Sequence, residues 1–152
     1  MNELDPNTLT AQLQDIWYKE IPLSKSMELS IVSFANNQLI TRASLAPNVN
    51  VHGSAFAGSL YSVQALTGWG MMHLQTQMLG LEASILIANG KINYALPVNQ
   101  DIIAICQFDD YESEIKRLSE DGNARFHLKC AVGVEDSVAS TFDGEYAVRI
   151  KT

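Results

Sequence analysis

The chain has 152 residues, of which 47% are hydrophobic and 18% are charged, and its formal net charge is −7. This length fits one domain, and the apolar content is sufficient for a sizeable core, which excludes a disordered chain. An acidic chain without a Lys/Arg cluster is a poor partner for nucleic acid or for an anionic membrane surface. Cys106 and Cys130 have no CxxC spacing, so they indicate reduced core thiols rather than a disulfide framework or a metal site.

The N-terminal segment predicts a helix over about residues 5–21. Asp5 is a candidate N-cap, Pro6 suits the first helical position, and Pro22 ends the helix. Apolar residues follow at spacings of three and four, which indicates a helix covering an apolar surface: Leu9, Leu13, Ile16 and Trp17. The segment lacks a basic start followed by an apolar run, so it is not a secretory signal and we expect a cytoplasmic protein.

Two antiparallel strands are predicted next, over about residues 26–34 and 38–46. Apolar and polar residues alternate in both segments, and "ANNQ" between them has the asparagines typical of a hairpin turn. Pro47 ends the second strand.

No residue from Ala43 to Leu81 carries a fixed charge. The sequence predicts one long helix over about residues 56–78, and Ser54 is a candidate for its N-cap. A helix with apolar residues on every face is buried either in a membrane or in a protein. Polar residues spread around it (Ser59, Ser62, Gln64 and Thr67) and the lack of a flanking Lys/Arg asymmetry disfavour a membrane span. We therefore expect a helix enclosed by its own protein.

After Gly80 the pattern changes to four strands, in "EASILIANGKINYALPV", "DIIAICQFD", "ARFHLKCAVGV" and "SVASTFDGEYAVRI", with Gly90 as a predicted bulge. "DYESEIKRLSEDGN" predicts a short helix or an irregular excursion. This order lacks βαβ alternation and predicts an α+β domain whose mostly antiparallel six-stranded sheet curls around the long helix. Small residues are expected to let strand backbones approach that helix closely: Ala57, Gly58, Ala65, Gly68 and Gly70.

Two stretches resemble the hotdog-fold thioesterase family whose domain also occurs C-terminal to GNAT-type acetyltransferases. "NVNVHGSAFAGSLYSVQALTGWG" resembles the start of that family's central helix, through Asn50, Ser54, Phe56, Gly58, Ser59, Leu60, Gly68 and Trp69. "INYALPVNQDIIA" resembles the third-strand signature of hotdog enzymes, with Tyr94 and Pro97 ahead of Asp101. The resemblance covers about residues 25–150 and implies a single hotdog domain over 1–152. It implies an acyl-CoA or acyl-carrier-protein thioesterase without a cofactor, since CoA or phosphopantetheine is part of the substrate.

The same resemblance places the active site at the start of the central helix. Asn50 and Gly53 match the family's Asn and first Gly, Phe56 stands where a His is usual, and Ala65 stands at the usual acidic position. Free N–H groups of the helix start would form the oxyanion hole. Because the acid is absent, we predict His52 as the base and Gln64 as a residue that orients water. The predicted catalytic residues are Asn50, His52, Gly53 and Gln64, and the predicted substrate-binding residues are Ser54, Phe56, Ala57, Gly58, Ser59 and Tyr94.

Each of these assignments has a structural alternative. Asn50 would simply hold the turn, His52 would make a local hydrogen bond, and Gln64 would satisfy a buried carbonyl. Ser54 is a better candidate for a cap than for a nucleophile, because no G-x-S-x-G elbow is present. For the whole chain, the alternative is a non-catalytic hotdog domain that binds an acyl thioester or a protein partner. A third alternative is a dehydratase of acyl thioesters, which has the same fold. Such an enzyme normally needs a His with an acidic partner, and the missing acid disfavours it here.

The resemblance also implies a homodimer or a dimer of dimers. A single curled sheet has free edges, which proteins usually pair or cover. Hotdog domains typically join through the third strand, here about Lys91 to Leu96, where no Pro or charge interrupts from Ile92 to Leu96. Asn93 or Asn99 is then a candidate to reach the other subunit's helix start.

Overall fold

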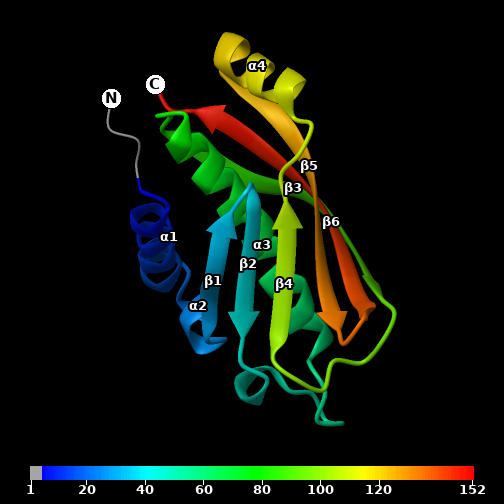
Figure 1. The fold of residues 1–152 in the computed structure, drawn as a ribbon. Helices are drawn as coiled ribbons and strands as arrows, with labels where there is room; N and C mark the ends of the chain where they lie inside the picture. The colour runs from blue at the N-terminus through cyan, green and yellow to red at the C-terminus, as the bar shows by residue number, and fades with distance from the viewer. Residues whose placement is uncertain (1–4) are drawn as a thin grey trace.

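The computed structural model describes residues 5–152 and has the predicted α+β architecture (Figure 1). Its helices are α1 (Pro6–Glu20), α2 (Pro22–Ser26), the short 3-10 helix η1 (Ala46–Asn48), α3 (Ala57–Met78) and α4 (Glu112–Asp121). The strands are β1 (Leu29–Ala35), β2 (Gln38–Ala43), β3 (Ala83–Tyr94), β4 (Ile102–Gln107), β5 (Asn123–Val134) and β6 (Ser137–Ile150).

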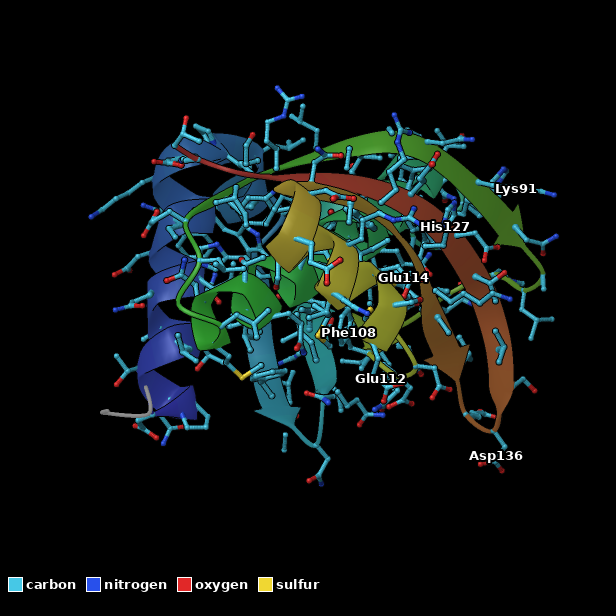
Figure 2. All side chains as sticks on the ribbon, turned by 90° about the horizontal axis from the view of Figure 1, so that it is seen from above. Lys91, Phe108, Glu112, Glu114, His127 and Asp136 are labelled. Carbon is cyan, nitrogen blue, oxygen red and sulfur yellow. The ribbon has the colours of Figure 1, made fainter. Side chains whose placement is uncertain are left out.

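The strands form one six-stranded sheet in the order β1-β2-β4-β5-β6-β3, and every neighbouring pair is antiparallel. α3 lies against one face of this sheet, with α1 beside it at the β1 side (Figure 1). Seen from above, β3 and β6 arch around α3, so the sheet encloses the helix from that side (Figure 2). This is the hotdog arrangement predicted from the sequence.

The uncharged helix is buried within its own fold, as predicted. Side chains around α3 have no exposed surface, among them Val63, Met71 and Leu74. Where the sheet does not cover it, α1 does: a Cβ on Gly70 would lie 2.6 Å from Cζ2 of the buried Trp17. No helix within residues 5–152 has the length and apolar character needed to cross a membrane.

The predicted "ANNQ" hairpin is confirmed. Asn36 and Asn37 have φ values of 53° and 58°, which is the left-handed geometry that a two-residue type I′ turn requires. The strands are shorter than predicted, since β1 begins at Leu29 after α2 and β2 ends at Ala43 before η1.

The first helix follows the prediction, since Asp5 stands at the N-cap of α1, Pro6 is its first residue and Pro22 lies just beyond its end, although the Asp5 side chain makes no capping hydrogen bond. The prediction for Gly90 was wrong. The bulge in β3 falls between Ile87 and Asn89 rather than at Gly90. At Gly90 the missing side chain makes room for the Tyr61 hydroxyl, which would lie 2.2 Å from a Cβ.

Gly68 likewise faces an aromatic side chain rather than a strand backbone. A Cβ at this position would lie 2.1 Å from the hydroxyl oxygen of Tyr146. The small residues of α3 therefore admit buried aromatic rings from the sheet and from α1.

Candidate active site

The N-terminus of α3 has no side-chain cap. The N-cap position is held by Phe56, and Ser54, which we predicted as the cap, lies outside the helix. The amides of Ala57, Gly58 and Ser59 have no hydrogen-bond acceptor within residues 5–152, and the first satisfied amide is that of Leu60, bonded to the Phe56 carbonyl at 3.0 Å. Such a helix end presents three donors and the positive end of a dipole to a bound oxygen atom.

Backbone hydrogen bonds fix the chain that leads into α3. The Phe56 amide donates to the Asn48 carbonyl at 2.7 Å, and the Ala55 amide donates to the Val98 carbonyl at 2.7 Å. The helix start is thereby tied both to η1 and to the segment after β3, which are distant in the sequence.

Asn50 closes the loop between these two anchors. Its Oδ1 accepts from the amides of His52 at 2.8 Å and Ser54 at 3.2 Å, and its Nδ2 donates to Ser54 Oγ at 3.0 Å. Gly53, with φ of 78°, supplies the left-handed turn within this loop. Asn50 therefore holds the turn, as the structural alternative stated, and it also lines a cleft.

That cleft, which we call the Tyr94 cleft, lies on the β3 side of the helix start and has a volume of about 320 Å³. The Tyr94 hydroxyl donates to the Ala57 carbonyl at 2.8 Å, so β3 holds the first turn of α3 directly. Burial raises the pKa of Tyr94 above its usual value, so this hydroxyl keeps its proton at neutral pH. The lining residues are Asn50, Ser54, Ala55, Ala57, Leu60, Tyr94, Ala95, Leu96, Pro97 and Val98.

A second cleft, which we call the Asn48 cleft, lies on the α2 side of the same helix start and has a volume of about 340 Å³. Three of the predicted substrate-binding residues, Phe56, Gly58 and Ser59, line this cleft. The other lining residues are Leu23, Ser26, Met27, Pro47, Asn48 and Ser62, none of which the sequence analysis had selected. The free amides of α3 thus stand between two clefts.

Three predicted catalytic residues, His52, Gly53 and Gln64, line neither cleft. His52 is exposed at the tip of its loop, next to Val51, which is 95% exposed. Gln64 is fully buried, and its Nε2 donates to the Leu60 carbonyl at 3.1 Å and to Ser140 Oγ at 3.0 Å. These contacts match the structural alternative for Gln64.

Among residues 5–152, no charged side chain lines either cleft. Ala65, at the position where the family resemblance places an acid, is buried, and its carbonyl accepts from the Tyr146 hydroxyl at 2.8 Å. Within residues 5–152, no cluster of His, Cys, Asp and Glu is arranged to hold a metal ion.

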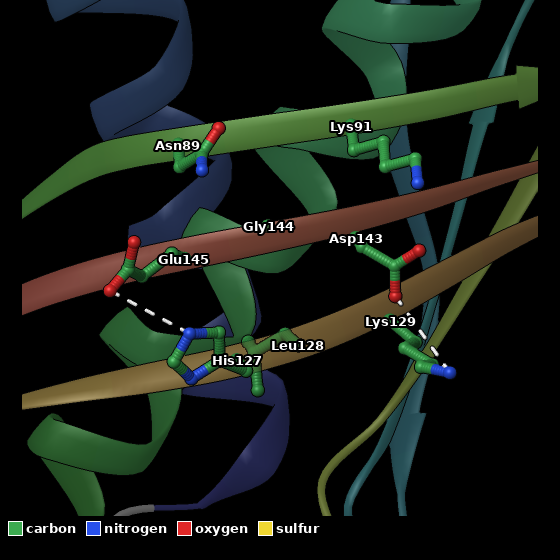
Figure 3. Close-up of a pocket in the computed structure, with 8 residues that line it drawn as sticks. All are labelled: Asn89, Lys91, His127, Leu128, Lys129, Asp143, Gly144 and Glu145. Carbon is green, nitrogen blue, oxygen red and sulfur yellow. Dashed lines mark ion pairs between the residues drawn. The ribbon is translucent and has the colours of Figure 1, made fainter.

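A third hollow, of about 260 Å³, lies on the outer face of the sheet over β3, β6 and β5 (Figure 3). Lys129 and Asp143 pair across it at 3.8 Å, and His127 and Glu145 at 3.6 Å. Such exposed ion pairs contribute little to stability. This hollow has no free helix amides, so it is a weaker candidate for acyl chemistry.

A curled antiparallel sheet around one long helix, with an open helix start beside clefts, defines a hotdog-class protein. The family model described as "Putative thioesterase (yiiD_Cterm)" matches residues 10–150, and the chain belongs to this family. This finding confirms the resemblance stated from the sequence.

Solved structures agree with that membership. A protein of unknown function from Chlorobaculum tepidum TLS is 30% identical, with a TM-score of 0.91 over 98% of this chain and 99% of that chain. A "putative thioesterase" from Shewanella oneidensis is 34% identical, with a TM-score of 0.85 over 93% of this chain and 97% of that chain. A "probable thioesterase" from Pseudomonas aeruginosa, 18% identical, shares the fold, with a TM-score of 0.77 over 93% of this chain and 96% of that chain.

Proposed function

We propose that the protein hydrolyses the thioester of an acyl-CoA or an acyl carrier protein at the start of α3. The observation that carries this proposal is the uncapped helix start, where the amides of Ala57, Gly58 and Ser59 stand free between two clefts. A thioester carbonyl has the acyl chain on one side and the thiol part on the other. Amide donors with a cleft on each side could therefore bind the carbonyl oxygen while each cleft takes one of these two parts.

In the proposed reaction the thioester carbonyl oxygen accepts hydrogen bonds from these amides. Water adds to the carbonyl carbon, and the oxygen becomes an oxyanion that the amides and the helix dipole stabilise. The C–S bond then breaks, the acid leaves with the water oxygen, and the proton taken from water reaches the thiolate sulfur. Asn50 contributes by fixing the loop and by lining the Tyr94 cleft.

We keep His52 as the proposed base because, in the part of the chain that the structure describes, Tyr94 is the only titratable residue that lines either cleft. Tyr94 is unsuited to this role, since burial raises its pKa and its hydroxyl already donates to Ala57. His52 is exposed in the single chain, so it would act through a change in its loop or through a second subunit that covers the helix start. Gln64, with its buried amide, is proposed to position the helix backbone rather than water.

Replacing His52 with alanine should lower turnover at least about tenfold, as expected for loss of a general base. The melting temperature should stay within a few degrees of the parent, because the side chain is exposed and makes no hydrogen bond within residues 5–152. Steady-state kinetics and thermal unfolding of the same sample measure both. Undiminished turnover would remove His52 from the mechanism.

The lack of a carboxylate at Ala65 supports a second candidate function, a hotdog domain that binds an acyl thioester without hydrolysing it. A screen of acyl-CoA thioesters of increasing chain length, followed by release of free thiol, separates the two. Hydrolysis above the uncatalysed rate supports the enzyme, whereas tight binding without thiol release supports the binding domain. Asn50→Ala is a poor test here, because loss of its side-chain hydrogen bonds to His52 and Ser54 would also loosen the loop.

We further propose that the protein is a cytoplasmic homodimer, or a dimer of dimers, joined through β3. β3 is an edge strand of the sheet, so its outer side presents backbone N–H and C=O groups to a partner strand, and its exposed apolar side chains, Leu86 at 66% and Ile87 at 40%, would pack beside those of that strand. Tyr94, at the end of this strand, lines the Tyr94 cleft, so a subunit paired there would stand next to the helix start. Asn93 and Asn99, both exposed, are the groups proposed to reach the partner's site.

Light scattering at micromolar concentration should give a mass at least twice the single-chain value of 16.7 kDa. A Lys or Glu replacing Leu86 should shift the mass toward the monomer, because a charge at a paired edge must be desolvated. Val138, which is also exposed and apolar but lies on β6, provides the matched control site. A mass near the single-chain value for the unmodified protein would contradict both the proposed dimer and the proposed site shared between subunits.

A further inference from the structure

The Asn48 cleft contains a buried hydrogen-bond acceptor without a donor. Asn48 is 2% exposed, and its Nδ2 donates to the Met27 carbonyl at 2.9 Å and the Ser44 carbonyl at 2.7 Å. These two carbonyls fix the orientation of the amide, because the opposite orientation would place Oδ1 against two other acceptors. Asn48 Oδ1 has no hydrogen-bond partner within residues 5–152. A buried acceptor left unpaired costs about 1–3 kcal/mol, so a donor from outside residues 5–152 would stabilise this atom.

The rest of the cleft presents donors. The amides of Gly58 and Ser59 are free, and the hydroxyls of Ser26, Ser59 and Ser62 make no hydrogen bond within the described part of the chain. Leu23, Met27 and Phe56 supply apolar walls, and no charged side chain from residues 5–152 lines the cleft. This set complements a neutral ligand that carries N–H donors and C=O acceptors on an aliphatic chain.

Three parts of a thioester substrate can be compared as occupants of the Asn48 cleft: an alkyl chain, a phosphate and a secondary amide. An alkyl chain has no donor for Asn48 Oδ1, and a phosphate would lack a cation. A secondary amide provides both an N–H and a carbonyl, and its neighbouring methylene groups suit the apolar walls. The Tyr94 cleft, with Leu60, Leu96 and Val98 in its lining, is the more suitable of the two for an acyl chain.

We propose that the Asn48 cleft binds the amide-bearing arm on the thiol side of the substrate, the pantetheine arm that CoA and carrier proteins share. The N–H of the amide nearest the sulfur donates to Asn48 Oδ1, and the acyl chain extends into the Tyr94 cleft. Asn48 is thus a residue that binds and orients substrate. This inference rests on the proposed function, because it assumes that the thioester carbonyl lies at the start of α3.

The test compares two small thioesters with the same acyl group. One is an S-acyl-N-acetylcysteamine; the other is the matching S-acyl-2-mercaptoethyl acetate, in which an ester oxygen replaces the amide N–H. Rates are divided by those of hydroxide-catalysed hydrolysis to remove intrinsic reactivity. The amide substrate should have a kcat/KM at least about tenfold higher, as expected when a buried acceptor loses its donor.

Variants then assign the preference to this cleft. Asn48→Leu removes the acceptor and should bring the ratio of the two kcat/KM values close to one. Asn48 also donates to the carbonyls of Met27 and Ser44, so Asn48→Leu alone could lower stability. A second variant is therefore needed that blocks the cleft but keeps these two hydrogen bonds. Ser62→Phe, which fills the cleft from a half-buried helix position, should raise KM for the amide substrate and abolish the preference. Ala95→Phe, which narrows the Tyr94 cleft instead, should keep the preference.

A ratio near one in the parent protein would overturn the inference while thioester hydrolysis itself stood. Failure of the proposed function is read separately, from calorimetric binding of pantetheine, which contains no thioester. Binding of pantetheine that is lost in Ser62→Phe and kept in Ala95→Phe would uphold the assignment even for a protein without hydrolase activity. In a protein without hydrolase activity, absence of pantetheine binding would reject it.

Discussion

Replacing Ala57 with proline should lower kcat about a hundredfold, the effect typical of losing one donor from an oxyanion hole. Ala57 is the first residue of α3, and its amide has no acceptor within residues 5–152, so the substitution removes a donor without breaking an internal bond. Proline suits the first helical position, since its fixed φ matches the helix. Phe56 has φ of −64° and ψ of 137°, which is the extended geometry that a residue before proline requires. The melting temperature should therefore be unchanged or slightly raised.

Ala57→Val is the matched control, because valine has a similar bulk in the Tyr94 cleft but keeps the amide. Single-turnover kinetics of both variants on one acyl-CoA isolates the chemical step. A large fall in kcat for the proline variant relative to the valine variant assigns the Ala57 amide to the transition state. Equal kcat values would leave only Gly58 and Ser59 as donors, and the carbonyl would then lie toward the Asn48 cleft.

The elements predicted from the sequence with most success are those whose burial follows a simple period. In β5, the alternation in "ARFHLKCAVGV" predicts one apolar face of Phe126, Leu128, Cys130, Val132 and Val134; the first four are buried and Val134 is half-buried. The uncharged stretch that begins at Ala43 gave the long buried helix because a helix apolar on every face must be enclosed. Paired asparagines fixed the hairpin between β1 and β2, since few other residues adopt left-handed geometry at two successive positions.

Boundaries that depend on competing hydrogen bonds were beyond sequence reasoning. Ser54 has the chemistry of a helix cap, but Asn50 binds both its amide and its hydroxyl, so the helix begins later with Phe56 at the N-cap. Which of two partners a serine takes depends on the fold of the loop. That same competition leaves the helix start open to a ligand.

The candidate site shows the same division between local and long-range information. Asn50, Ala57 and Tyr94 were selected from two separate motifs, and the structure brings them together at one cleft. Asn48 was missed as a site residue, although it is the first residue of the quoted stretch "NVNVHGSAFAGSLYSVQALTGWG". Its burial depends on the carbonyls of Met27 and Ser44, and no periodicity signals that a side chain will bridge two such segments.

Replacing Gly68 with alanine should destabilise the protein by about 2–3 kcal/mol, from overpacking together with a weakened buried hydrogen bond. On helix propensity alone the change would stabilise by roughly 1 kcal/mol, because glycine is a poor helix former. Here the new Cβ would lie 2.1 Å from the Tyr146 hydroxyl oxygen and 2.6 Å from Cζ of its ring. Tyr146 has no exposed surface and donates to the Ala65 carbonyl, so neither its ring nor its hydroxyl has free space to move into.

Gly58→Ala is the matched control within the same helix. Its Cβ would lie 2.4 Å from Cε2 of Phe56, but that ring is 54% exposed and can turn away into solvent. Chemical denaturation should therefore show a lower midpoint for the Gly68 variant and little change for the Gly58 variant. Combining Gly68→Ala with Tyr146→Phe should restore part of the loss, because the hydroxyl oxygen is the atom nearest the new methyl group. A Gly68→Ala protein as stable as the parent would mean that the sheet shifts away from α3, and would contradict the tight packing inferred between them.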